Sequence, residues 1–195
     1  MLLELQKGEQ PKELYDSYLG LGNVSYPQAK FDGALTFYKK CAAPAVASIN
    51  RKAFWQGRIG VGQVKLARGD YHGARTDFAA ILEEIVSTKD VDIVSLSMAY
   101  NSMIECMTTI GQYQAAIDSC DAAIKVIEKH SSPKNTYIAD LLVHKGNAYI
   151  NIGKLREGEI CMNEAIGIYK NILGENHPNY ASACVMFANY YILVG

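Results

Sequence analysis

The sequence has almost no net charge. Its 195 residues include 19 Lys and Arg against 20 Asp and Glu, which gives a formal net charge of −1. Such a balance provides no basic footprint for DNA, RNA or an anionic lipid surface. We therefore expect neither nucleic acid nor a membrane among the partners of this chain.

Long apolar runs are also missing. No stretch approaches the roughly 18 apolar residues that mark a membrane-spanning helix. The opening residues, MLLELQKGEQPK, contain Glu4 and no basic leader, so they do not read as a secretory signal. Apolar residues nevertheless make up 49% of the chain, enough for a continuous core. These features predict a cytoplasmic protein in a reducing, intracellular environment.

The cysteines form neither a metal-binding motif nor a disulfide framework. There is no CxxC pair and no histidine at metal-ligand spacing, and the count of five is odd. We interpret the thiols as free side chains, of which three fall on repeated core positions: Cys41, Cys120 and Cys184. We expect no metal and no other cofactor.

Catalytic motifs are absent as well. The sequence has no nucleophile elbow, phosphate-binding glycine loop, HExxH or dinucleotide fingerprint. Its glycines are spaced regularly along the chain rather than clustered. We therefore expect this protein not to be an enzyme.

What the chain does contain is one phrase repeated four times. The phrase GKLREG at 153–158 returns as GQYQAA at 111–116, GDYHGA at 69–74 and, more weakly, AKFDGA at 29–34. Successive copies are 40, 42 and 42 residues apart. Four residues after each phrase stands a larger residue, and twelve residues before its last position stands a glycine or isoleucine. The larger residues are Tyr38, Phe78, Cys120 and Met162, and the earlier ones are Gly22, Gly62, Ile104 and Gly146.

A fixed period of this size predicts a solenoid of helix pairs. The pattern of aromatic, glycine and alanine positions resembles the tetratricopeptide (TPR) repeat, and the period, longer than the usual length of about 34 residues, is similar to that of the kinesin light chain subclass. The resemblance implies an all-α fold, an α-solenoid of antiparallel helix pairs (a TPR superhelix) with about nine helices. It implies a single array over 1–195, with repeats at about 15–48, 55–88, 97–130, 139–172 and a partial one at 181–195.

Periodicity and capping residues place the expected helices. We predict them at 11–26, 28–42, 50–68, 71–86, 91–110, 113–130, 135–152, 155–173 and from 178 to the last residue. Residues 43–50 form the least regular connection and could extend the following helix. Lys65 and Lys145 stand at positions where the pattern expects packed side chains. Either their aliphatic stems are buried while the amines reach water, which we favour for Lys145, or the local register is shifted by one residue.

The last predicted helix is unusually apolar. It carries Val185, Phe187, Tyr190, Tyr191 and Ile192, whereas the terminal helix of a solenoid is normally polar. Gly195 also stands where a fifth repeat would turn into its second helix. We therefore expect the chain to be a fragment of a longer protein. A full-length chain that buries this helix by dimerising is the alternative.

The resemblance implies that the first helix of each pair lines a concave groove. Carried over copy by copy, the groove positions include seven candidate binding residues: Asn23, Gln63, Asn101, Glu105, His144, Asn147 and Asn189. A side-chain amide both donates and accepts hydrogen bonds, so it can pair with the backbone of an extended peptide. These residues could equally be solvated side chains that face an empty groove.

The groove positions carry no Lys or Arg, but they include Asp16, Glu105 and Asp140. A clamp for a C-terminal carboxylate needs cations that are absent here. We therefore predict a protein or peptide partner that is neutral or basic rather than acidic. The leading hypothesis is a non-catalytic interaction module that acts as adaptor or scaffold. The alternative is a structural subunit of a larger assembly that associates, with itself or with others, through the apolar helix at 181–195.

Overall fold

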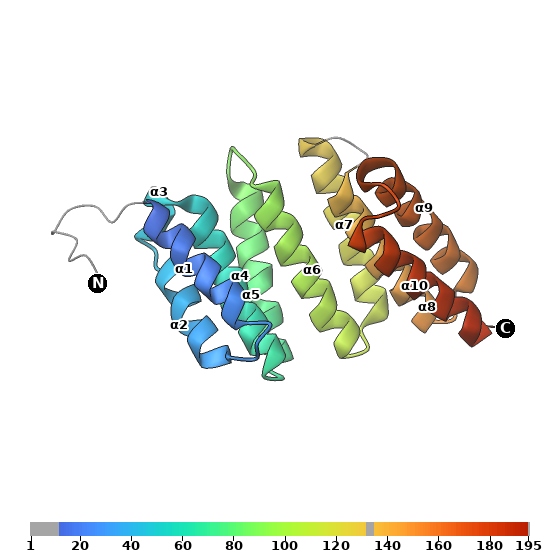
Figure 1. The fold of residues 1–195 in the computed structure, drawn as a ribbon, viewed down its shortest axis with the longest axis horizontal. Coiled ribbons are helices and arrows are strands. Elements are labelled where there is room, and N and C mark those ends of the chain that lie inside the picture. The colour runs from blue at the N-terminus through green and yellow to red at the C-terminus, as the bar shows by residue number, and fades with distance from the viewer. Residues whose placement is uncertain (1–11, 132–134, 195) are drawn as a thin grey trace. The chain divides into compact units, whose positions relative to one another are not determined.

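The structure, a computed structural model, describes residues 12–131 and 135–194, without the side chains of residues 189, 190 and 192–194. The described residues form ten helices and no strand (Figure 1). The helices are α1 (Lys12–Ser25), α2 (Phe31–Cys41), α3 (Val46–Ile49), α4 (Arg51–Ala67), α5 (Tyr71–Ser87), α6 (Ile93–Thr109), α7 (Tyr113–His130), α8 (Thr136–Asn151), α9 (Leu155–Leu173) and α10 (Pro178–Val194).

The predicted all-α fold is confirmed. The described residues form one helix more than the roughly nine expected. The additional helix is α3, four residues within the connection at 43–50. The bounds of α7 and α9 are as predicted, and the others differ by one to three residues. Some of these differences come from N-caps. Asn50, Asp92 and Asn135 each accept a hydrogen bond from the first turn of the helix that follows, so each stands just outside that helix.

The chain divides into two compact units at Ser87–Thr88. In the first unit, α1 pairs with α2 and α4 pairs with α5, while α2 also packs against α4. In the second unit, α6 pairs with α7 and α8 with α9, while α7 packs against α8 and α10 against α9. Each unit therefore contains two of the predicted repeats, and the second also contains the helix of the partial fifth repeat.

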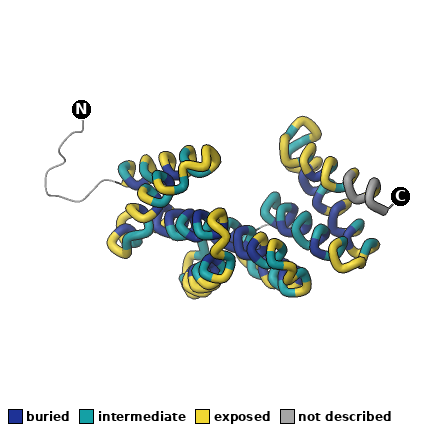
Figure 2. The backbone as a smooth tube through the Cα atoms, turned by 90° about the horizontal axis from the view of Figure 1, so that it is seen from below, coloured by how far each residue is buried: buried dark blue, intermediate teal, exposed yellow. Residues whose placement is uncertain are grey.

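Each unit is held together by the small and large residues of the repeated phrase. The small residues Ala34, Ala74, Ala116 and Gly158 are buried, and so are the larger Tyr38, Phe78, Cys120 and Met162. Figure 2 shows the buried stretches along the sides where helices of one unit face each other, and the exposed stretches on the outer turns. The predicted phase of the repeat is therefore confirmed by burial.

The turns within the helix pairs use a left-handed backbone conformation. Gly69, Gly111 and Gly153 have φ angles of 83°, 76° and 78°, a region that costs glycine nothing. In the first repeat the corresponding residue is Ala29, with φ of 57°, where a side chain is disfavoured.

The two lysines at core positions end in ion pairs. Lys145 Nζ lies 2.5 Å from Asp121 Oδ1, with 17% of the lysine side chain exposed, and Lys65 Nζ lies 2.6 Å from Asp77 Oδ2. The stem of Lys145 is therefore largely buried, as predicted, but its amine meets a carboxylate rather than water alone. The neighbouring Gly146 is buried against Met162, so the register is not shifted.

Candidate functional site

Helix α8 presents the densest set of predicted groove positions. Its start is fixed by Asn135, whose Oδ1 accepts the N–H of Ile138 at 3.0 Å. From that start, spacings of three and four residues place the following side chains on one side of the helix: Asp140, Val143, His144, Asn147 and Asn151. We call this side the α8 groove face.

One hollow of about 330 Å³ lies between the α8 groove face, the end of α6 and the start of α7. It is lined only by uncharged polar groups: Thr108, Thr109, Tyr113, His144, Asn147 and Asn151. Its volume lies within the range of small-ligand pockets in proteins. We call it the polar hollow.

Three side chains of the polar hollow are already engaged with their own helices. The hydroxyls of Thr108 and Thr109 donate to the carbonyl of Glu105 at 3.1 and 2.7 Å, and Asn151 Nδ2 donates to the carbonyl of Asn147 at 2.8 Å. The side chains of His144 and Asn147 and the hydroxyl of Tyr113, by contrast, have no hydrogen-bond partner within the described residues. A ligand could pair with these groups, of which His144 and Asn147 are predicted groove residues.

The protonation states around the polar hollow are set by desolvation. Burial lowers the pKa of His144, so its imidazole is uncharged near neutral pH and offers one donor and one acceptor. Partial desolvation raises the pKa of Glu105, one turn before Thr108 and Thr109 on α6. Glu105 has no hydrogen-bond or ion-pair partner for its side chain within the described residues.

A second hollow, of about 200 Å³, lies on the other flank of α8, against α9 and α10. It combines apolar and polar lining residues: Asp140, Val143, Tyr169, Asn179, Ser182, Ala183 and Met186. The hydroxyl of Tyr169 donates to Asp140 Oδ1. Desolvation raises the pKa of Asp140, and this hydrogen bond opposes the rise. Asp140 is therefore engaged within the protein.

The seven predicted groove residues differ in their location and in their hydrogen bonding. Asn23 and Gln63 belong to the first unit, where Asn23 Oδ1 accepts a hydrogen bond of 3.0 Å from the Tyr38 hydroxyl. On α6, the Oδ1 of Asn101 is buried and has no hydrogen-bond partner within the described residues. Asn189 lies on α10, but its side chain is outside the described residues. Two of the seven, His144 and Asn147, line the polar hollow.

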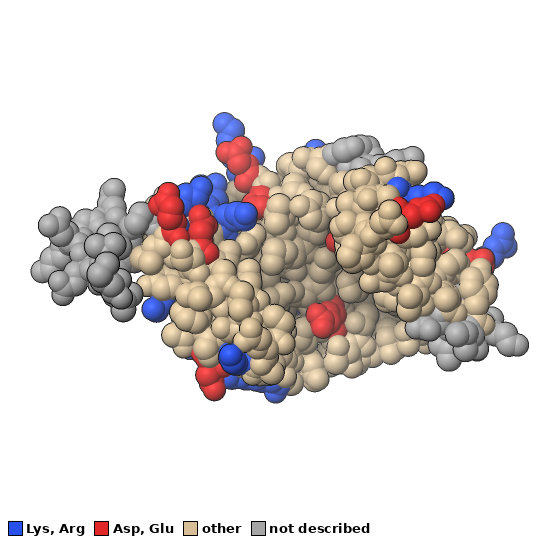
Figure 3. Space-filling view, in the orientation of Figure 1, with Lys and Arg blue, Asp and Glu red and all other residues tan. Residues whose placement is uncertain are grey.

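The acidic character predicted for the groove rests mainly on Glu105. Asp16 Oδ1 accepts a 2.8 Å hydrogen bond from Asn50 Nδ2, and Asp140 is bound by Tyr169. In Figure 3 the surface over α6 and the described part of α10 is largely uncharged, with an acidic group over the lower half of α6.

The sequence prediction missed four residues of the polar hollow: Thr108, Thr109, Tyr113 and Asn151. A signal was available for two of them. Thr109 and Asn151 stand 42 residues apart, at the same repeat position, one helical turn beyond the last groove position considered. Extending the groove by one turn would have included both.

Residues 139–172 match the family model described as tetratricopeptide repeat. Comparison of the sequence with curated proteins finds no significant match. None of the helices in the described ranges has the length and apolarity that a membrane crossing requires.

The fold is similar to several solved structures. A putative kinesin light chain of Podosopora anserina with TPR-like repeats gives a TM-score of 0.69 at 14% identity, covering 94% of this chain and 87% of that one. BtubC (BKLC) from P. vanneervenii gives 0.67 at 14% identity, covering 91% of this chain and 66% of that one. MamA from Desulfovibrio magneticus RS-1 gives 0.53 at 18% identity, covering 95% and 97%. The predicted resemblance to TPR proteins of the kinesin light chain type is thus confirmed at the level of the fold.

Proposed function

Because this chain has the fold of the tetratricopeptide repeat proteins, we propose that it is a protein–protein interaction module whose second unit binds an extended segment of a partner along the α8 groove face. The observation that carries the proposal is the pair of unpartnered side chains, His144 and Asn147, in the uncharged polar hollow. In this proposal the protein acts as an adaptor or scaffold in the cytoplasm and performs no catalysis.

An extended peptide suits this surface because its backbone alternates donors and acceptors. The amide of Asn147 can pair with both, and so can the uncharged imidazole of His144. Each of three further side chains donates one hydrogen bond within its own helix, namely those of Thr108, Thr109 and Asn151. Their oxygens can still accept a hydrogen bond from a ligand N–H.

The charge of the site favours a neutral or basic segment. No Lys or Arg lines either hollow of the second unit, so an acidic segment would find no cation there. Glu105 is the carboxylate free to meet a Lys or Arg of the ligand. Glu105 is exposed, so such a pairing would be weakened by salt.

Peptides selected from a random library against the intact chain would test the proposal. We expect the Asn147→Ala variant to bind them more weakly by about 1–3 kcal/mol, because a ligand group is left unpaired. Asn163→Ala is the matched control, since Asn163 is an exposed asparagine of α9 that lines neither hollow. Affinity should also fall as salt rises, and less steeply in Glu105→Gln. If Asn147→Ala and Glu105→Gln both bind every selected peptide as tightly as the unmodified chain, the α8 groove face is not the site.

A second candidate function is self-association or assembly through α10. The described part of this helix exposes 60% of Val185, 38% of Met186 and 51% of Tyr191. Exposed apolar side chains that form a contiguous patch are typical of association surfaces. Sedimentation over a range of concentrations tests this function. A dimer that Val185→Glu dissociates would support it, and a monomer at every concentration would contradict self-association.

A further inference from the structure

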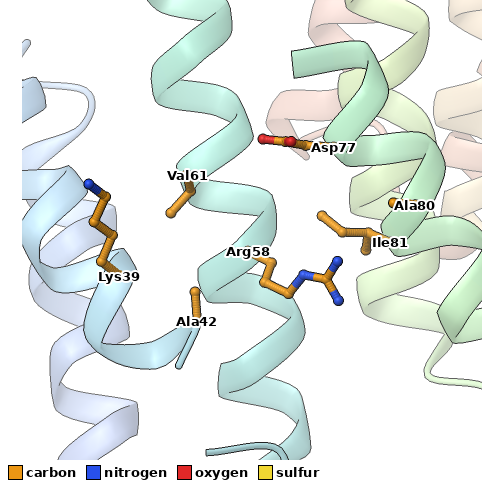
Figure 4. A pocket seen from close by; sticks show the side chains of 7 residues that line it. All are labelled: Lys39, Ala42, Arg58, Val61, Asp77, Ala80 and Ile81. Atoms are coloured by element: carbon orange, nitrogen blue, oxygen red, sulfur yellow. The ribbon is translucent and has the colours of Figure 1, made fainter. Parts of the chain in front are cut away.

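The first unit contains a hollow that the groove does not explain. It has a volume of about 330 Å³ and lies between α2, α4 and α5 (Figure 4). We call it the outer hollow. Seven residues line it: Lys39 and Ala42 of α2, Arg58 and Val61 of α4, and Asp77, Ala80 and Ile81 of α5.

Four of the seven residues that line the outer hollow are apolar, namely Ala42, Val61, Ala80 and Ile81, and the two alanines leave space that larger side chains would fill. The close approach of α2 to α4 depends on Gly57, since a Cβ there would lie 2.5 Å from Cys41 Cβ and 2.9 Å from the backbone nitrogen of Ala42. The hollow is therefore formed by tight helix packing and not by a loose loop.

Two of the three charged side chains at the rim are held in place. The Arg58 guanidinium binds both oxygens of the Glu84 carboxylate, at 2.6 and 2.9 Å, and lies 5.4 Å from the ring centre of Trp55. Asp77 Oδ2 forms an ion pair with Lys65 Nζ at 2.6 Å. A ligand would therefore meet these two side chains already ordered, and they would add little conformational entropy cost on binding.

The third rim charge is uncompensated. Lys39 is exposed and has no hydrogen-bond or ion-pair partner for its amine within the described residues. Arg58 and Asp77 are each neutralised by their partners, which leaves the rim with one net positive charge. In Figure 4 the Lys39 amine and the Asp77 carboxylate lie on opposite sides of Val61, with the Arg58 guanidinium directed towards Ile81.

We propose that the outer hollow is a second protein-binding site, which takes a partner segment with a large apolar side chain next to an Asp or Glu. The apolar side chain fills the space beside Ala42, Val61, Ala80 and Ile81, and the carboxylate pairs with Lys39. This site goes beyond the α8 groove face. It lies in the other unit and prefers the opposite ligand charge.

A matched pair of variants tests the apolar part of the site. Ala80→Leu fills the outer hollow, whereas Ala79→Leu adds the same atoms to the neighbouring exposed residue, which does not line it. Peptides from a random library, selected on the intact chain, are the probe. We expect one class of selected peptides to lose affinity by about tenfold or more with Ala80→Leu and to be unaffected by Ala79→Leu. Equal melting temperatures of the two variants would show that both fold.

The charge preference is tested on the same peptides. In this class an apolar residue should stand beside an Asp or Glu, and Lys39→Gln should weaken binding by about two- to fivefold, with Lys40→Gln as control. Methyl resonances of Val61 and Ile81 should shift when such a peptide is added. Peptides of this class should bind Asn147→Ala normally, so a failure here and a failure at the α8 groove face are distinguishable.

Three outcomes would overturn the proposal. The first is that no selected peptide distinguishes Ala80→Leu from Ala79→Leu. The second is that the peptides that do so carry Lys or Arg in place of the acid. The third is a dimer of the intact chain that Ala80→Leu dissociates, which would make a second copy the occupant.

Discussion

Phe78 occupies the space that Gly62 leaves open. A Cβ on Gly62 of α4 would lie 2.6 Å from Cε1 and 2.8 Å from Cζ of the Phe78 ring on α5, and the ring is fully buried. The same relationship holds between Gly22 and Tyr38, where the distance would be 2.5 Å. Glycine inside a helix is disfavoured by about 1 kcal/mol relative to alanine. The ring contact is the reason that glycine is nevertheless required here.

Gly62→Ala should therefore destabilise the protein, by about 1–3 kcal/mol, because the buried ring of Phe78 has no room to move. Gly20→Ala is the control, since a Cβ added to Gly20 of α1 would meet no atom within 4 Å. That substitution should instead stabilise by about 0.5–1 kcal/mol. Urea unfolding of the two variants measures both effects. An unchanged or raised free energy of unfolding for Gly62→Ala would contradict the packing described.

At the repeat positions of Gly62 and Phe78, the third repeat has a large residue in place of the glycine and a small one in place of the ring. Ile104 and Cys120 stand where Gly146 and Met162 stand in the fourth repeat, and all four are buried. Cys120→Met alone should overpack the core, and Ile104→Gly alone should leave a cavity. The double variant should be less destabilised than the sum of the two, by about 0.5–3 kcal/mol. Strict additivity in denaturant unfolding would show that the two positions are not complementary.

Ala29 provides a test of backbone strain. It adopts φ of 57° at the turn where the other repeats have glycine. Ala29→Gly should stabilise the protein by about 0.5–1 kcal/mol because the left-handed conformation no longer carries a penalty. Gly153→Ala, with open space around the new side chain, should destabilise by a similar amount. Thermal unfolding should move in opposite directions for the two variants, and a shift in the same direction would contradict this explanation.

The buried thiols and phenol predict a loss of stability in alkali. Desolvation raises the pKa of Cys41 from 9.0 to about 11, of Cys120 from 9.0 to about 12 and of Tyr38 from 10.0 to about 12. Their contribution to stability is complete below pH 9. Above pH 9 for the two thiols, and above pH 10 for Tyr38, the unfolded chain releases protons that the folded chain keeps. The free energy of unfolding should therefore fall by about 1.4 kcal/mol per pH unit for each such group, until the pKa of the folded state is passed.

Urea unfolding at a series of pH values between neutral and about 10.5 would measure this slope. In Cys120→Ala the free energy of unfolding should fall less steeply with pH, by the amount that one titrating group contributes. Cys184→Ala, which removes a half-buried thiol, serves as the control. A free energy of unfolding that is constant over this range would contradict the prediction.

Some features of the groove could not be predicted from the sequence. Asn23 and Asn147 occupy the same repeat position, yet Asn23 is bound by Tyr38 while Asn147 lines the polar hollow without a partner. The fourth repeat has Met162 where the first has Tyr38, so the hydroxyl that engages Asn23 has no equivalent there. The pairing of Lys145 with Asp121 spans 24 residues and joins two repeats. Such pairings depend on which side chains from distant segments meet.

The sequence by itself determined the helix pairs, their order and their buried faces. These follow from local physics: a spacing of three to four residues defines one side of a helix, and a recurring Gly or Ala marks where two helices approach. Only the tertiary structure decided which groove residues are available, where the hollows lie, and that the described residues fall into two units at Ser87–Thr88. The physical reason is that a hollow is the space left between side chains of several helices. Its existence depends on how all of them pack at once, as the two alanines beside Val61 show.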